Sequence, residues 1–354
     1  MIPISVCIIA KNEEKNIERC LSSLAPYGFE IILVDTGSTD KTKELASKYT
    51  NHIYDFKWVN DFSAARNYSL NQASNDWIFM IDCDETLQSV DLEELDYFKK
   101  HLSHAVGSVN RENLTGTPEN PGRTVDRTER FFSRKRFHYT GRIHEQLTPK
   151  YGKDMEAFLL NVTLFHDGYL MDESTRMQKA KRNLDLLHLQ LSEEPQNPYL
   201  FYQLGKGYEM IGDIDIACKW FGDGLTFDLD PTLAYVQAMV ISYGHALLQT
   251  GQAEKALQFI NIYDNFSSSA DFVYLMGLIY KENKYYAQAI HEFKKALGFE
   301  FANQDGVNSF LAYYQLGEIL ASIGETESAI KFFKMCGEYS QSKQLLASLS
   351  QSAP

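Results

Sequence analysis

The sequence has no long apolar run and few cysteines. None of its segments approaches the roughly 20 consecutive apolar residues that a membrane-spanning helix needs. Its first residues lack the basic and apolar regions of a signal peptide. The five cysteines are scattered and never adopt CxxC spacing, which indicates reduced, buried thiols rather than a disulfide framework. We therefore expect a cytoplasmic protein without a membrane span.

Positive charge is also scarce. The chain carries 34 Lys and Arg residues against 47 Asp and Glu residues, a net charge of −13. Broad nucleic-acid binding requires a basic face, so we expect no nucleic-acid partner. Any phosphate-binding site must be built locally, from a few basic residues and a metal ion. The length of 354 residues fits two globular domains.

In the first half, short apolar segments alternate with segments of helical periodicity. Residues 5–10, 30–34, 53–55 and 77–81 are predicted strands, and residues 16–24 and 41–48 are predicted helices. Repeated strand–helix units predict a Rossmann-like α/β domain with a mostly parallel sheet. Ligands bind such sheets beyond the carboxyl ends of the strands. We therefore expect residues 10–13, Asp35 and residues 82–84 to converge on one crevice.

The part of the chain between the last of these strands and the second half is less regular. Residues 113–127 contain Gly, Pro, Thr and Asn without periodicity, which predicts a mobile loop. Residues 131–133 and 137–139 have the composition of short strands. Residues 159–165 are predicted to form a further strand that delivers His166 to its end.

The second half contains a repeated pattern. Four glycines each follow a large residue, and each is followed at fixed offsets by an alanine and then by a bulky apolar residue. The glycines are Gly205, Gly244, Gly277 and Gly317; the alanines are Ala217, Ala256, Ala289 and Ala329; the bulky residues are Phe221, Ile260, Phe293 and Phe333. This is the tetratricopeptide pattern of paired antiparallel helices. It predicts an α/β domain over residues 1–170, a linker helix over 171–198 and an all-α repeat domain over 199–350.

An Asp-x-Asp motif, Asp82-Cys83-Asp84, follows the predicted strand at residues 77–81. Two carboxylates at a strand end can bind one divalent cation, which neutralises a diphosphate and stabilises it as a leaving group. An isolated motif of this kind is often only a helix cap or a solvated turn. Its place after a buried strand favours the metal site.

Four motifs in order resemble those of the family-2 glycosyltransferases, which have the GT-A fold. They are IIAKNEE at residues 8–14, ILVDTGSTD at 32–40, DFSAARN at 61–67 and DCDE at 82–85. The resemblance covers about the first 90 residues, with weaker similarity to about residue 170. It implies a nucleotide-sugar donor, usually a UDP-sugar, and a divalent metal ion, Mg²⁺ or Mn²⁺.

The same resemblance assigns roles to individual residues. It implies that Glu13 and Asp35 hold the nucleobase and ribose, although Asp35 could serve only the following turn. Arg66 would contact the nucleotide and diphosphate, and Asp84 would be the more direct metal ligand beside Asp82. The candidate nucleotide-sugar-binding residues are Ala10, Asn12, Glu13, Asp35, Arg66, Asp82 and Cys83.

The late acidic motif of the family is not visible, and the segment GRIHEQL at residues 141–147 stands in its place. Glu145 is the candidate general base that takes the proton of the acceptor, and His144 is its rival. Both could also be ordinary residues on a strand surface. His166 is the candidate third metal ligand, as a late histidine is in many GT-A enzymes, or else a structural histidine. An imidazole ligand suits Mn²⁺ better than Mg²⁺.

The combination of this domain with tetratricopeptide repeats is similar to bacterial enzymes that glycosylate peptide bacteriocins on Cys or Ser. It also resembles sugar transferases of the lipopolysaccharide core. Stacked helix pairs form a groove suited to a peptide, or equally to the second subunit of a homodimer. We predict an inverting hexose transfer from a UDP-sugar to a peptide side chain. The alternatives are a carbohydrate or lipopolysaccharide-type acceptor, and a peptide-binding adaptor that has lost activity.

Overall fold

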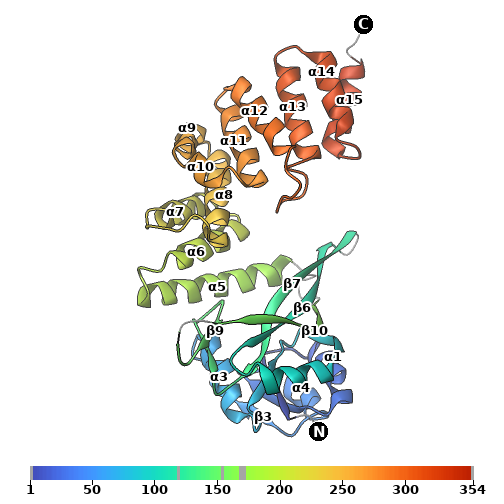
Figure 1. Ribbon diagram of the computed structural model, residues 1–354, viewed down its shortest axis with the longest axis vertical. Helices are drawn as coiled ribbons and strands as arrows, with labels where there is room; N and C mark the ends of the chain where they lie inside the picture. Colours follow the sequence, from blue (N-terminus) through green and yellow to red (C-terminus); the bar gives the residue numbers. More distant parts are fainter. Residues whose placement is uncertain (1–2, 118–119, 153–154, 167–172, 352–354) are drawn as a thin grey trace. The chain divides into compact units, whose positions relative to one another are not determined.

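The computed structural model describes residues 3–117, 120–152, 155–166 and 173–351. The chain divides into two compact units, Met1–Glu193 and Glu194–Pro354. The first is an α/β unit and the second is all-helical (Figure 1). The long helix α5 (Glu173–Glu193) falls within the first unit.

A mixed sheet of eight strands, counted over the described residues, forms the centre of the first unit. Its strands, in spatial order, are β3 (Ile53–Asp55), β2 (Glu30–Asp35), β1 (Ile4–Ala10), β4 (Trp77–Met80), β7 (Asn120–Ser133), β6 (Val106–Thr117), β10 (Ala157–His166) and β5 (Glu85–Val90). The first four strands are parallel, as the strand–helix alternation predicts. The antiparallel strand β7 follows β4, and a small second sheet pairs β8 (Phe137–Thr140) with β9 (Gln146–Pro149).

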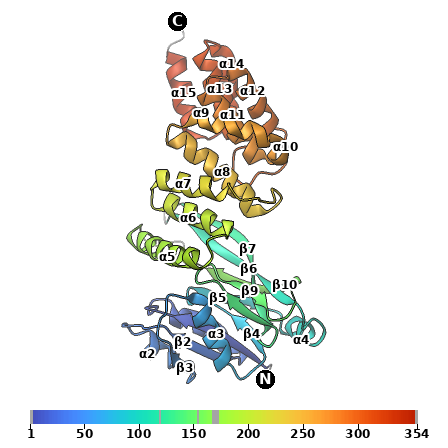
Figure 2. The same cartoon turned by 90° about the vertical axis from the view of Figure 1, so that its left-hand side faces the viewer.

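Helices pack on both faces of this sheet (Figures 1 and 2). Alternate residues of β1 divide between two cores: Val6 and Ile8 pack with α1 and α4, whereas Cys7 packs with α3. The apolar run of β1 is therefore explained by burial on both sides. The helices of this unit are α1 (Ile17–Leu24), η1 (Ala25–Tyr27), α2 (Thr42–Ala46), α3 (Phe62–Gln72), α4 (Leu92–His101) and α5.

The predicted mobile loop at residues 113–127 is wrong. Its described residues, 113–117 and 120–127, belong to the antiparallel strands β6 and β7, in which Asn113 pairs with Thr124 and Asn110 with Arg127. The antiparallel ladder is held by backbone hydrogen bonds, which do not require alternating hydrophobicity. Arg111 adds a bidentate ion pair across the strands to Asp126, at 2.8 and 2.9 Å. Composition alone could not reveal this hairpin.

The second unit is an array of helix pairs, and the predicted tetratricopeptide fold is confirmed. Its helices are α6 (Pro198–Met210), α7 (Ile214–Gly224), α8 (Ala234–Gln249), α9 (Ala253–Ala256), η2 (Leu257–Ile262), α10 (Tyr263–Phe266), α11 (Ala270–Glu282), α12 (Tyr286–Ala296), α13 (Phe310–Ser322), α14 (Thr326–Met335) and α15 (Ser340–Gln351). In three pairs the repeat glycine faces the phenylalanine of the same repeat. A Cβ at Gly205 would lie 2.3 Å from the Phe221 ring. The missing side chain is what lets the two helices approach.

The second repeat departs from this pattern. Ile260 is 47% exposed, whereas its neighbour Phe259 is buried. Gly244 faces Leu275 of the next repeat instead. Here residues Leu257–Ile262 wind as a 3₁₀ helix, whose tighter turn changes the direction of each successive side chain. Ile260 therefore does not face the repeat glycine as the phenylalanines of the other three repeats do.

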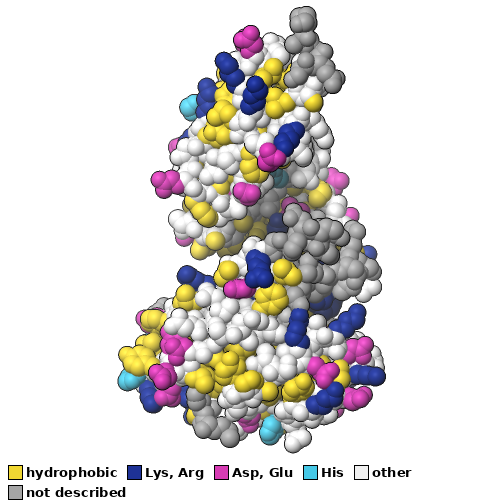
Figure 3. Space-filling model, turned by 90° about the vertical axis from the view of Figure 1, so that its right-hand side faces the viewer, with side chains coloured by type: hydrophobic (Ala, Val, Ile, Leu, Met, Phe, Trp, Pro, Cys, Tyr) yellow, Lys and Arg dark blue, Asp and Glu magenta, His cyan; other side chains and the backbone are white. Residues whose placement is uncertain are grey.

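The surface is polar and mixed in charge. Lys and Arg are interspersed with Asp and Glu on the face drawn in Figure 3, with hydrophobic side chains between them. Within the described part of the chain, no helix has the length and apolar character to cross a membrane.

Candidate active site

The carboxyl ends of β1 and β4 open into a cavity of about 360 Å³. Nine predicted site residues line it: Ala10, Glu13, Arg66, Asp82, Cys83, Asp84, His144, Glu145 and His166. Asn12 and Asp35 are not among its lining residues. The convergence expected from the strand ends therefore holds for most of the predicted set.

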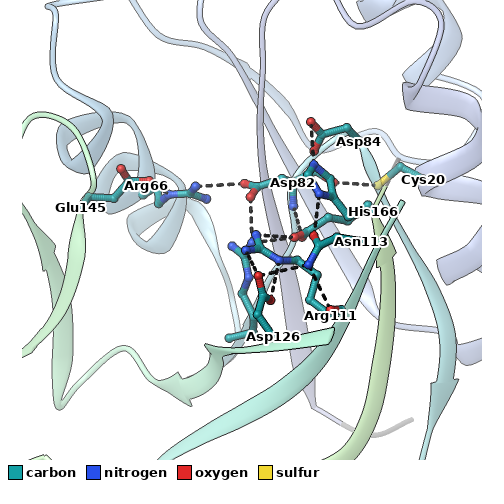
Figure 4. Close-up of polar contacts among 11 residues, drawn as sticks. Cys20, Arg66, Asp82, Asp84, Arg111, Asn113, Asp126, Glu145 and His166 are labelled. Carbon is teal, nitrogen blue, oxygen red and sulfur yellow. Dashed lines mark hydrogen bonds and ion pairs between the residues drawn. The ribbon is translucent and has the colours of Figure 1, made fainter. Parts of the chain in front are cut away.

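Asp82 lies between two arginines (Figure 4). Its Oδ1 accepts a hydrogen bond from Arg66 at 2.9 Å, and its Oδ2 accepts one from Arg130 at 2.8 Å. Burial by itself would raise the pKa of Asp82, but the two guanidinium groups hold it well below its usual range. Both oxygens are thus engaged by protein cations, and the carboxylate stays ionised.

Arg66 joins this carboxylate to Glu145. Its Nε donates to Oε1 of Glu145 at 2.5 Å. Arg66 is presented by α3, whose N-terminus is capped by Asp61 through the backbone N–H of Ala64. The backbone N–H of Phe62, on the same helix, donates to the carbonyl of Arg142. The start of α3 is therefore hydrogen-bonded to the 141–145 segment that lines the cavity.

Glu85 and Arg130 complete the arginine–carboxylate network, and the sequence analysis gave neither a role. Glu85 is fully buried, accepts from Arg130 at 2.7 Å and also accepts from the backbone N–H of Asp82 at 2.9 Å. Burial raises the pKa of Glu85 despite the neighbouring Arg130. Arg130 comes from β7, close to the segment without periodicity, so no pattern in the sequence pointed to it.

Asp84 faces His166, with 3.4 Å between its Oδ2 and the histidine Nε2 (Figure 4). The Nδ1 atom of His166 lies 2.9 Å from Oδ1 of Asn113, which fixes the ring orientation. A carboxylate and an oriented imidazole are suitable ligands for a divalent cation. Within the described residues no group of three or more His, Cys, Asp or Glu side chains is placed to hold a metal. The pair therefore fits a cation that is also held by oxygens of a bound ligand.

One carboxylate oxygen of Asp35 stabilises the turn that follows β2. Its Oδ2 accepts from the backbone N–H groups of Gly37 and Ser38, at 3.1 and 2.9 Å. Its Oδ1 is buried and has no hydrogen-bond partner among the described residues. A buried acceptor without a partner is costly, so Oδ1 has an unused capacity to accept. The turn role and the predicted binding role are compatible.

The first motif turns sharply after β1. Asn12 has a φ of 56°, and its side chain accepts from the backbone N–H of Thr39 at 2.8 Å. Ala10 accepts from Thr36 through its carbonyl at 2.9 Å. Burial raises the pKa of Glu13, partly offset by a hydrogen bond from Asn16. Asn12 therefore joins the turns that follow β1 and β2 and does not line the cavity.

Cys83 and His144 differ in environment. The buried thiol of Cys83 donates to the carbonyl of Ile9 at 3.4 Å, so it packs the motif against β1. His144 is an exposed residue with a φ of 50°, in the left-handed region that a histidine adopts only at a cost. Desolvation lowers the pKa of His144, opposed by the charge of Glu145.

The cavity also has lining residues that the sequence analysis did not consider. Trp58 and Phe62 contact each other edge to face, with ring centroids 4.9 Å apart. Lys179, Arg182 and Asn183 enter from α5. This helix lies beyond the region that resembles known motifs, so no motif pointed to these three residues.

A mostly parallel α/β sheet with an Asp-x-Asp motif and a buried arginine network beside one cavity is the arrangement of a GT-A-type domain. Comparison with protein families gives the specific assignment. Residues 5–158 match the family described as glycosyl transferase family 2, and residues 270–303 and 311–342 match the tetratricopeptide repeat. The first domain is therefore similar to glycosyl transferase family 2, and tetratricopeptide repeats follow it in the chain.

Curated relatives agree with this assignment. The chain is 30% identical over 217 residues to the SPbeta prophage-derived glycosyltransferase SunS of Bacillus subtilis, covering 59% of this chain and 50% of SunS. It is 28% identical to a TPR repeat-containing protein of Synechococcus elongatus, covering 64% and 57%. It is 28% identical to the lipopolysaccharide core biosynthesis glycosyltransferase LpsC of Rhizobium meliloti, covering 42% and 58%. The chain thus spans only about half the length of these relatives.

Proposed function

We propose that this chain is a metal-dependent, inverting glycosyltransferase that moves a hexose from a UDP-sugar to a Cys or Ser side chain of a peptide. The observation that carries the proposal is the single cavity shared by Arg66, Asp84, His166 and Glu145. One ligand in this cavity would be within reach of the candidate cation-binding groups and of the candidate base, which supports the proposal.

On the donor side, Asp84 and His166 would hold the metal ion. The cation, when bound, neutralises the diphosphate and so favours its departure. Asp82 keeps Arg66 and Arg130 in position, because each of its oxygens accepts from one of them. We assign the nucleobase or ribose to Asp35, whose Oδ1 has no partner among the described residues; Asp35 does not itself line the cavity, but Glu13 and its neighbour Thr36 do.

On the acceptor side, Glu145 takes the proton of the acceptor hydroxyl or thiol. Its Oε1 is held by Arg66, and its Oε2 has no hydrogen bond to a described residue. The acceptor atom forms a bond to the anomeric carbon as the bond from that carbon to the diphosphate oxygen breaks. The electron pair of the broken bond leaves with the nucleotide, and the proton stays on Glu145. Attack opposite the leaving group inverts the anomeric configuration.

The repeats support a peptide acceptor, since stacked helix pairs suit an extended or helical peptide. A carbohydrate acceptor is the second candidate, favoured by the similarity to LpsC. An adaptor without activity is less well supported, because the residues proposed for catalysis and donor binding, Arg66, Asp84, His166 and Glu145, all line the cavity. A homodimer through the repeats is compatible with the peptide-transfer proposal.

The test is hydrolysis and transfer with a panel of UDP-sugars, with Mn²⁺ and with EDTA. Metal-dependent release of UDP supports the donor proposal, and mass spectrometry of peptides and oligosaccharides incubated with the enzyme distinguishes the acceptors. Light scattering gives the oligomeric state. Absence of turnover with every donor and acceptor, together with peptide binding, would favour the adaptor.

A further inference from the structure

One face of helix α5 carries two cationic side chains that line the candidate active-site cavity. Lys179 and Arg182 are three positions apart and Asn183 follows, a spacing that places all three on the same side of a helix. All three line the same cavity as Asp84 and His166. The helix belongs to the same compact unit as the sheet, so this face is part of the site.

These two cations differ from the arginines of the network in having no carboxylate partner among the described residues. Among the described residues, the Arg182 guanidinium donates to Oδ1 of Asn183, at 3.0 and 3.3 Å, and lies 5.3 Å from the centre of the Phe62 ring. Desolvation lowers the pKa of Arg182, and no carboxylate opposes that effect. Lys179 forms no ion pair with a described residue, although its charge acts on Glu13.

Arg66 and Arg130, by contrast, form ion pairs with Asp82, Glu85 and Glu145, although Nη1 of Arg66 and Nε of Arg130 have no hydrogen-bond partner among the described residues. A ligand that brings negative charge into the cavity therefore meets unpaired positive charge on α5, as far as the described residues show. Two adjacent cations facing one cavity match a ligand with two phosphates. The planar guanidinium is well suited to phosphate oxygens, and its stacking on Phe62 keeps it oriented.

We infer that Lys179 and Arg182 bind the diphosphate of the nucleotide-sugar donor and stabilise it as the leaving group. This inference rests on the proposed function, which supplies the diphosphate. When the bond between the anomeric carbon and the diphosphate oxygen breaks, the electron pair moves onto that oxygen. The ammonium and guanidinium groups are already in place to stabilise the added charge. The donor site is then incomplete without α5.

The test compares UDP with UMP by calorimetry on the full chain with Mn²⁺. Lys179→Ala and Arg182→Ala should each weaken UDP binding by about tenfold, the effect of losing one charge-assisted hydrogen bond. The loss for UMP should be smaller, so the ratio of the two affinities should fall. Lys181→Ala is the matched control, because Lys181 lies on the same helix and does not line the cavity. Arg182→Lys should retain part of the affinity.

The outcomes separate this inference from the proposed function. If the unmodified chain binds no UDP, the donor proposal itself fails. If it binds UDP and both alanine variants bind UDP as tightly, α5 has no role at the diphosphate and the donor proposal stands. Equal losses for UDP and UMP would also overturn the inference. Circular dichroism checks the fold, and Lys179→Gln with Arg182→Gln replaces any alanine variant that unfolds.

Discussion

The Nε atom of Arg66 donates to Oε1 of Glu145 at 2.5 Å, while another nitrogen of the same guanidinium donates to Asp82 at 2.9 Å. One side chain thus connects the candidate base with the Asp-x-Asp motif. The two carboxylates come from distant segments of the sequence, since Asp82 follows β4 whereas Glu145 lies between β8 and β9. A change of charge at Asp82 should therefore alter the electrostatic environment of Glu145, and the reverse should also hold.

Replacing Arg66 should damage stability as well as activity. Arg66→Ala leaves the carboxylates of Asp82 and Glu145 close together with one cation fewer, and breaking such a buried pair costs about 3 kcal/mol. We expect the free energy of unfolding in urea to fall by about that amount. Arg142→Ala, which removes a more exposed pair with Glu193, should have a much smaller effect. Equal losses in the two variants would contradict the structural role of Arg66.

Glu145→Gln should lower turnover by about 10²- to 10⁴-fold, the usual contribution of a positioned general base. UDP affinity should be nearly unchanged, because the amide oxygen can still accept from Arg66. Steady-state kinetics and calorimetry measure the two effects separately. If His144→Ala alone causes the loss, the roles of the two residues are exchanged. With a cysteine acceptor, the defect should shrink at high pH, where the thiolate forms without a base.

Asp84→Ala should abolish metal-dependent turnover without unfolding the protein. Its carboxylate contacts His166 at the cavity and is not part of the hydrophobic core. We expect a change of less than about 1 kcal/mol in the free energy of unfolding, as for most substitutions outside the core. Titration with Mn²⁺ should show lost binding, and His166→Ala should show a partial loss. Full activity of Asp84→Ala in EDTA would rule out the metal ligand role.

Glu13 should make stability depend on pH in a defined direction. Burial raises its pKa above 4.5 in the folded protein, so the folded state binds this proton more tightly than the unfolded chain does. Its contribution to stability is therefore present at low pH and is lost as the pH rises from about 4.5 through the raised pKa. Glu13→Gln cannot ionise and should lack this decline. Urea unfolding of both proteins between pH 4 and 7 gives the difference, and parallel curves would show that Glu13 is not perturbed.

Removal of the repeats should separate donor chemistry from acceptor choice. A chain of residues 1–195 keeps the whole first compact unit, including α5. We expect it to hydrolyse a UDP-sugar slowly with Mn²⁺, and to fail on a peptide at concentrations where the full chain works. Peptide glycosylation at the full rate by the shortened, monomeric chain would show that the repeats select neither acceptor nor partner.

Sequence patterns predicted the parts of the fold that depend on local periodicity. The buried strands around Ile8, Leu33 and Phe79 have apolar runs because both faces of the sheet are covered. The hairpin of β6 and β7 was missed because backbone hydrogen bonds hold it. For the same reason Arg130 could not be placed beside Asp82. Such a contact depends on the register of β7 against β4, which no short motif encodes.

The residues of the candidate site likewise divide into those that local motifs identify and those that only tertiary packing brings to the cavity. Motifs placed Arg66, Asp82 and Asp84 in one crevice, since each stands at a strand end or near a helix start. Lys179 and Arg182 occur in an amphipathic helix where a lysine or arginine would ordinarily be a solvated residue. They differ from Lys181 only in that they lie on the face of α5 that lines the cavity. A tertiary contact of this kind has no local signature.

The 3₁₀ segment in the second repeat has a consequence for how the array unfolds. Repeat arrays behave as chains of units coupled to their nearest neighbours, and cooperativity spreads only as far as that coupling is strong. Between Ala253 and Phe266 one continuous helix is replaced by three short pieces, which provide fewer regular hydrogen bonds. Amide hydrogens there should exchange with solvent sooner than those of α11 or α13. The array should then melt as two blocks, with the break at the second repeat.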